Sequence, residues 1–194
     1  MEEKILQHFE QSSRLVHDCG RSSASVIMQM ARELINCFER GGKLLLFGNG
    51  GSAAQAQHFA AELVNKLSAY RKALPAIALT TDSSVLTSIG NDINFSDIFS
   101  RHIEALGRNG DVAWGMSTSG NSFNLIKGFT TAHEIGMLTI AFSGSDGGII
   151  AQLADLCLTV PSHSTAQVQE VHLCAGHVLC ELIEEYFLVQ AQQT

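Results

Sequence analysis

The sequence is poor in proline, in basic residues and in long apolar runs. Its 194 residues include only 2 prolines and 12 lysines and arginines, against 19 acidic residues, so the formal net charge is −7. Binding to duplex nucleic acid normally needs a basic face, and this balance argues against such an interface. No apolar run approaches the roughly 20 residues that a membrane-spanning helix requires. We therefore expect neither nucleic acid nor a membrane as a partner.

Cysteine is also scarce and shows no pairing pattern. The five cysteines are an odd number without Cys-x-x-Cys spacing, which is typical of reduced, mostly buried thiols. Residues 1–6 are acidic and polar and lack the basic and apolar regions of a secretory signal. These features predict a cytoplasmic location.

The composition and length fit one domain over residues 1–194, with 45% hydrophobic residues to build its core. Apolar side chains recur at helical spacing over 2–18 and 23–40, and Gly41 and Gly42 end the second stretch. We therefore expect an N-terminal α-hairpin over residues 1–40.

Short apolar runs alternate with helical patterns through the rest of the chain. Such runs are typical of parallel strands buried on both faces. The runs cover 44–47, 76–79, 112–116, 138–142 and 156–160. The alternation predicts a doubly wound α/β fold with a five-stranded parallel sheet, closed by a long helix from about 165 to 189.

Two glycine- and serine-rich loops follow the first and third of these runs. They read Gly-Asn-Gly-Gly-Ser at 48–52 and Ser-Thr-Ser-Gly-Asn-Ser at 117–122. Loops at the carboxyl ends of strands can bind an anion through helix N-terminal amides and hydroxyls. Neither loop matches the Walker or the dinucleotide pattern. The predicted ligand is therefore a sugar phosphate or similar monoester, held by backbone amides and by Ser52, Ser117, Thr118, Ser119 and Ser122.

Candidate chemical groups lie on two predicted helices. His58 and Glu62 are four residues apart and share one helix face. Gln169 and His177 are separated by about 80° and about 12 Å on the last helix, so both can face one cleft. They would bind one small ion only by reaching toward each other, and a ligand set completed by another subunit is equally consistent. Imidazole nitrogens, carboxylate oxygens and amide oxygens are all acceptable zinc ligands.

Asn91 and Asp92 follow the second strand on a short predicted helix. A carboxylate there can bind sugar hydroxyls, and the alternative is a turn that ends the helix.

Seven motifs in chain order resemble the phosphoheptose isomerases of the sugar isomerase (SIS) domain family. They are GNGGS at 48–52, HFAAEL at 58–63, PAIAL at 75–79, GND at 90–92, STSGNS at 117–122, GSDGG at 144–148 and VQEVH at 168–172, with His177 beyond. The resemblance extends over nearly the whole chain. It implies a flavodoxin-like SIS fold.

The resemblance also implies roles for individual residues. Substrate binding would fall to Asn49, Gly50, Gly51, Ser52, Glu62, Asn91, Asp92, Ser117, Thr118, Ser119, Asn121, Ser122 and Gln169. The zinc-site positions, with one ion per subunit, would be His58, Glu62, Gln169 and His177. Glu62 and His177 also match the acid–base pair. Two departures are Lys66 and Gln167, which stand where relatives often carry arginine.

The implied reaction converts sedoheptulose 7-phosphate to D-glycero-D-manno-heptose 7-phosphate through an enediol, the first step toward ADP-heptose and the lipopolysaccharide core. The implied assembly is a homotetramer with active sites between subunits, to which the N-terminal helices contribute. Two alternatives remain: an isomerase of another phosphosugar, and a non-catalytic binding protein of the type that associates with the replication initiator. Proteins of the second type lack equivalents of Glu62 and His177, which this chain has.

Overall fold

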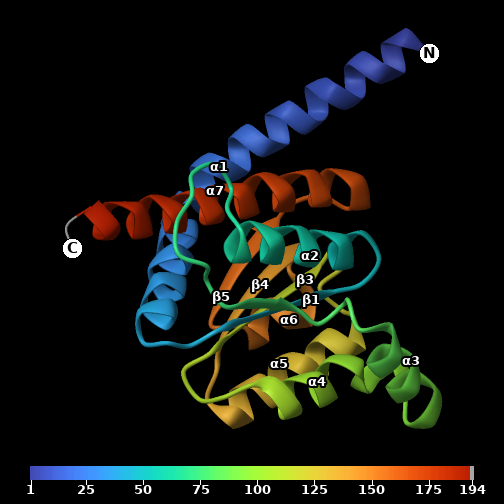
Figure 1. Ribbon diagram of the computed structural model, residues 1–194. Helices are drawn as coiled ribbons and strands as arrows, with labels where there is room; N and C mark the ends of the chain where they lie inside the picture. Colours follow the sequence, from blue (N-terminus) through green and yellow to red (C-terminus); the bar gives the residue numbers. More distant parts are fainter. Residues whose placement is uncertain (193–194) are drawn as a thin grey trace.

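The structure is a computed structural model that describes residues 1–192 (Figure 1). Positions 193 and 194 of the predicted domain lie outside the described residues. The strands are β1 (Leu44–Gly48), β2 (Ala76–Ala78), β3 (Val112–Ser117), β4 (Leu138–Gly144) and β5 (Leu156–Val160). They form one parallel sheet in the order β2-β1-β3-β4-β5. The predicted doubly wound fold is confirmed.

Helices cover both faces of the sheet. They are α1 (Glu2–Glu39), α2 (Gly51–Val64), α3 (Ser83–Asp92), α4 (Ile98–Leu106), α5 (Phe123–Ile135), α6 (Gly148–Leu153) and α7 (Thr165–Gln192), with a 3-10 turn at Phe95–Asp97. In Figure 1, α1, α2 and α7 lie on one side of the sheet, and α3, α4 and α5 lie on the other. None of the helices within residues 1–192 is long and apolar enough to cross a membrane.

Two apolar layers hold these helices to the sheet. On the α2 and α7 side, the rings of Phe59 and Trp114 stack with centroids 5.2 Å apart and planes within 2°. On the other side, Phe47 packs against Phe99 of α4 and Phe129 of α5. Every residue of β1 and of β3 is buried, because both faces are covered.

The predicted N-terminal hairpin is wrong, because α1 is one helix from Glu2 to Glu39. A glycine in a helix interior costs about 1 kcal/mol, which other contacts of the helix can offset. Here the neighbouring Cys19 is buried in a cluster with Val168 of α7. Gly20 therefore lies inside a continuous helix whose first turns project away from the body of the molecule (Figure 1).

Candidate functional site

The two glycine- and serine-rich loops leave neighbouring strands, β1 and β3, at the point where the strand order reverses. From β1 the chain crosses to β2 on one side, and from β3 it crosses to β4 on the other. The two connections diverge and open a crevice beyond the carboxyl ends of the strands, where ligands bind in this class of sheet.

A pocket of about 260 Å³ occupies that crevice. It is lined by Asn49, Gly50, Gly51, Ser52, Met116, Ser117, Thr118, Ser119, Ser122, Thr165 and Gln169. This volume suits a small phosphorylated molecule. The sequence analysis did not identify Thr165, the first residue of α7, as a site residue, although a hydroxyl at a helix N-terminus is a recognisable signal.

Three hydroxyls converge in the second loop. Ser117 Oγ lies 3.2 Å from Ser122 Oγ and 3.4 Å from Ser119 Oγ, and it accepts a hydrogen bond from the Gly120 amide. Ser122 occupies the N-cap of α5, yet its side chain makes no capping bond within residues 1–192. Hydroxyls at a helix N-terminus suit an anion such as phosphate.

The first loop needs its glycines for two different reasons. Gly50 has a φ of 54°, in the left-handed region that favours glycine. A Cβ at Gly51 would lie 2.5 Å from Nε2 of Gln169. The side chain of Gln169 therefore packs directly on the loop, and Gln55 of α2 holds its backbone carbonyl at 2.7 Å.

Two asparagines of the predicted substrate set are engaged with the protein itself. Asn49 and Asn124 exchange a reciprocal pair of amide hydrogen bonds, each 2.9 Å. Asn121 donates to the Ser119 carbonyl at 2.9 Å and accepts from the Ile149 amide at 3.1 Å. These bonds tie each loop to a neighbouring element. Asn124 is 3% exposed. The sequence analysis did not identify it, because its partner Asn49 is 75 positions away.

The other predicted groups meet between α2 and α7. The Nε2 atoms of His58 and His177 are 2.8 Å apart, and Glu62 Oε1 lies 3.0 Å from the first and 3.4 Å from the second. Glu62 is 9% exposed, and its Oε2 has no hydrogen-bond partner within residues 1–192. Both imidazoles remain substantially exposed, so substrate can reach them.

This group could hold a metal ion. One ligand atom from each of the three residues lies within 4.8 Å of the others. Two imidazole nitrogens and a carboxylate oxygen form a donor set that zinc accepts, with a position left open for substrate. Without a cation, the Nε2–H of one imidazole must donate a hydrogen bond to the Nε2 of the other. With a cation, both can coordinate through their lone pairs.

Cys180 lies behind this group on α7 and is 1% exposed. Burial and then the adjacent Glu62 carboxylate raise the pKa of its thiol. Cys180 is therefore a neutral neighbour of Glu62 rather than a thiolate.

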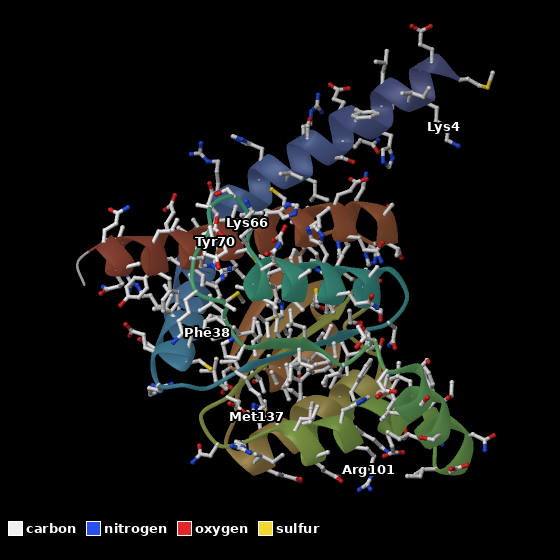
Figure 2. All side chains as sticks on the ribbon, in the orientation of Figure 1. Lys4, Phe38, Lys66, Tyr70, Arg101 and Met137 are labelled. Atoms are coloured by element: carbon white, nitrogen blue, oxygen red, sulfur yellow. The ribbon has the colours of Figure 1, made fainter. Side chains whose placement is uncertain are left out.

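The remaining predicted residues lie away from the pocket lining. Asn91 and Asp92 are exposed at the end of α3, where the Asn91 amide donates to Asp92 at 2.7 Å. Lys66 is exposed beyond α2 (Figure 2). Gln167 bonds Ser162 at 3.0 Å and Gln11 of α1 at 3.4 Å, so it joins α7 to α1.

Comparison with known proteins agrees with this geometry. The SIS domain family model matches residues 7–144. The chain is 50% identical over 185 residues to phosphoheptose isomerase of Aquifex aeolicus (strain VF5), which covers 95% of this chain and 97% of that protein.

Two solved structures are similar as well. Phosphoheptose isomerase from Neisseria gonorrhoeae is 44% identical with a TM-score of 0.90, covering 95% of this chain and 98% of that one. A phosphoheptose isomerase from Francisella tularensis is 38% identical with a TM-score of 0.91, covering 94% and 97%. With the family model matching most of its length and relatives aligned almost end to end, the chain belongs to the phosphoheptose isomerases of the SIS domain family.

Proposed function

We propose that the chain is an isomerase that interconverts sedoheptulose 7-phosphate and D-glycero-D-manno-heptose 7-phosphate. The observation that carries the proposal is the convergence of Glu62 and His177, from α2 and α7, on helices whose N-terminal residues line a phosphate-sized pocket. The membership of the family supports the same reaction. That reaction would be the first step in the supply of heptose for the cell envelope.

The pocket holds the phosphate end of the substrate. Backbone amides of the first loop and hydroxyls of Ser52, Ser117, Ser119 and Ser122 surround the phosphate, and Thr118 adds a further hydroxyl. Gln169 packs on the first loop, which places it next to the sugar chain of a substrate bound there. We assign Asn91 and Asp92, exposed at the end of α3, to the hydroxyls of the sugar chain beyond the pocket.

Glu62 and His177 then move the protons. The Glu62 carboxylate removes a proton from C1 of the ketose while His177 protonates the carbonyl oxygen on C2, giving the enediol. The enediol loses the proton from O1 and receives one at C2, which yields the aldose. No oxidant or reductant is consumed. Proton transfer of this kind contributes about 10²- to 10⁴-fold to a rate.

We further propose that His58, Glu62 and His177, with Gln169 as a fourth ligand, hold one zinc ion per subunit. The donor set supports this assignment. A bound zinc ion would polarise the substrate carbonyl and stabilise negative charge on its oxygen. A carboxylate or imidazole that binds zinc is a weaker base, so we expect Glu62 and His177 either to bind zinc loosely or to exchange roles during turnover.

We also propose a homotetramer with active sites between subunits. Support comes from apolar side chains on the projecting turns of α1, where Ile5 is 57%, Leu6 64% and Phe9 72% exposed. Exposed apolar surface of this kind is typical of an interface. Light scattering after gel filtration should give a mass of four chains, and Phe9→Glu should lower it. A monomer in the parent protein would contradict this proposal.

The function is tested by turnover with sedoheptulose 7-phosphate, ribulose 5-phosphate and fructose 6-phosphate, each with added zinc and after chelation. We expect turnover of the seven-carbon substrate and its loss on chelation. Glu62→Gln should lower kcat by at least about 100-fold and leave inorganic phosphate binding within twofold of the parent. Glu134→Gln, an exposed change on α5, is the matched control.

Two outcomes would redirect the proposal. Turnover of only the five- or six-carbon substrate would assign another phosphosugar. No turnover of any substrate by folded, zinc-loaded protein would favour a binding protein of the same fold.

A further inference from the structure

Two charged residues are buried next to the candidate site, although the proposed reaction does not use them. Arg71 is 6% exposed and Glu184 is 1% exposed. Arg71 Nε lies 3.6 Å from Glu184 Oε2, beyond hydrogen-bond distance. Charged groups are seldom buried without close polar partners. Their main partners are backbone groups, and the identity of these groups indicates a role.

Arg71 holds the end of α2. Its Nη2 donates to the carbonyl of Glu62 at 2.8 Å, and its Nη1 donates to the carbonyls of Leu63 at 2.7 Å and Lys72 at 3.0 Å. Since α2 ends at Val64, the carbonyls of Glu62 and Leu63 belong to its last turn, where carbonyls lack intrahelical partners. A cation at this end also complements the helix dipole. Arg71 thus anchors the backbone of the candidate catalytic residue itself.

Glu184 holds the segment that follows α2, the strap of residues 65–75. Its Oε2 accepts from the Leu67 amide at 2.9 Å, and its Oε1 accepts from the amides of Ser68 at 2.8 Å and Ala69 at 2.9 Å. Burial acts to raise the pKa of Glu184, but these backbone donors outweigh it and lower the pKa to about 2. Figure 2 shows the strap, marked by Lys66 and Tyr70, where it passes beside α7.

Glu184 and His177 share one face of α7. They are seven residues apart, which is about two helical turns and nearly a full return to the same direction. The face that presents His177 to Glu62 therefore also binds the strap, and Arg71 in the strap returns to the Glu62 backbone. Contacts from α7 through the strap to α2 thus form a closed loop around the site.

We propose that Arg71 and Glu184 are positioning residues that set the separation of Glu62 from His177. This inference rests on the proposed function of that pair. Losing either residue frees the last turn of α2 and moves Glu62 Oε1 from its place 3.4 Å from His177 Nε2. The phosphate pocket is at the other end of α2, where Gln55 holds Gln169. Phosphate binding should therefore survive.

The test uses the double variant Arg71→Met with Glu184→Met, because removing both charges avoids leaving one buried without its partner. We expect a folded protein whose kcat falls at least tenfold and whose zinc dissociation constant, measured by competition with a chelator, rises at least tenfold. The KM and the inhibition constant of inorganic phosphate should stay within twofold. Arg101→Gln with Glu104→Gln, an exposed ion pair on α4, is the control that should change nothing.

Folded variants with the parent's kcat and zinc affinity would overturn the proposal. An equal loss of phosphate and zinc binding would also overturn it, because that result indicates general unfolding. Arg71→Lys, which keeps the charge opposite Glu184 but loses the guanidinium fork that binds the α2 carbonyls, gives the same test if the double variant does not fold. If the parent protein lacks turnover, the proposed function fails, but zinc and phosphate affinities still decide whether Arg71 and Glu184 position the site.

Discussion

Asn49 illustrates how a residue in the right motif can serve a different purpose from the expected one. The resemblance places it among substrate-binding residues, whereas its amide oxygen and nitrogen both bond Asn124. That reciprocal pair connects the first loop to α5, which begins directly after the second loop. The structure therefore supports a role for Asn49 in holding the two loops together, and its direct contact with substrate stays a prediction.

We expect Asn124→Ala to weaken the binding of inorganic phosphate about tenfold, which is about 1.4 kcal/mol. The cause is the loss of both bonds that hold Asn49 beside the second loop. Isothermal titration of the parent, Asn124→Ala, Asn49→Ala and the double variant measures the effect. A shared role predicts that the double variant is no weaker than the single ones. Independent, additive losses would instead indicate that Asn49 binds phosphate separately.

Among the elements, α2 combines the most functions. Its N-terminus lines the pocket between the two loops, its middle carries His58, and its last turn carries Glu62 and is held by Arg71. The four-residue spacing of His58 and Glu62 predicted a shared helix face, and the structure confirms it. The spacing could not identify Arg71, because that contact depends on how the strap folds back.

The continuous α1 leads to a second prediction. Gly20→Ala should raise the free energy of unfolding by about 1 kcal/mol, because alanine favours a helix interior over glycine. Within the described residues, and apart from the neighbouring backbone of α1 itself, no atom lies within 4 Å of the position that a Cβ at Gly20 would take. Thermal melts at a fixed protein concentration should show a rise of about 2–4 °C.

Gly42→Ala is the contrasting variant, since its Cβ would lie 2.8 Å from Cys37 Sγ. It should lower the melting temperature. If Gly20→Ala also lowers the melting temperature, the residues near Gly20 do not form a helix interior. That result would support the predicted N-terminal hairpin instead of a continuous α1.

At the scale of the whole molecule, His172 couples stability to pH. It is fully buried between α7 and the sheet, with Nε2 3.1 Å from the Ser143 carbonyl and Nδ1 without a partner in the described chain. Burial lowers its pKa from 6.5 to about 4, against the opposing effect of the Ser143 bond. The folded protein therefore holds His172 neutral.

This burial predicts acid sensitivity. As pH falls from 6.5 toward 4, the unfolded chain gains a proton that the folded chain refuses, so the free energy of unfolding decreases by up to about 1.4 kcal/mol per pH unit. Below pH 4 the contribution levels off. Urea unfolding at pH 7, 6 and 5 measures the slope, and His172→Phe should reduce it. Equal slopes in the two proteins would contradict this assignment.

Local patterns in the sequence were enough to predict the strands, the order of the elements of the sheet, the positions of both glycine- and serine-rich loops and the last helix. Each of these depends on short-range spacing: alternating or continuous apolar residues, and small residues at turns that need them. The break expected near Gly20 was wrong, because a weak local preference gave way to packing of Cys19 against α7 and β5.

The tertiary structure alone decided which distant residues meet. His58 and His177 are 119 positions apart, yet their Nε2 atoms are 2.8 Å apart, and Glu184 reaches a strap 115 to 117 positions earlier. Sequence spacing reports neighbours within one helix or strand, whereas these contacts require crossovers that bring α2 and α7 to the same face of the sheet. The sequence therefore determined the family and the chemical groups, and packing determined how those groups are held.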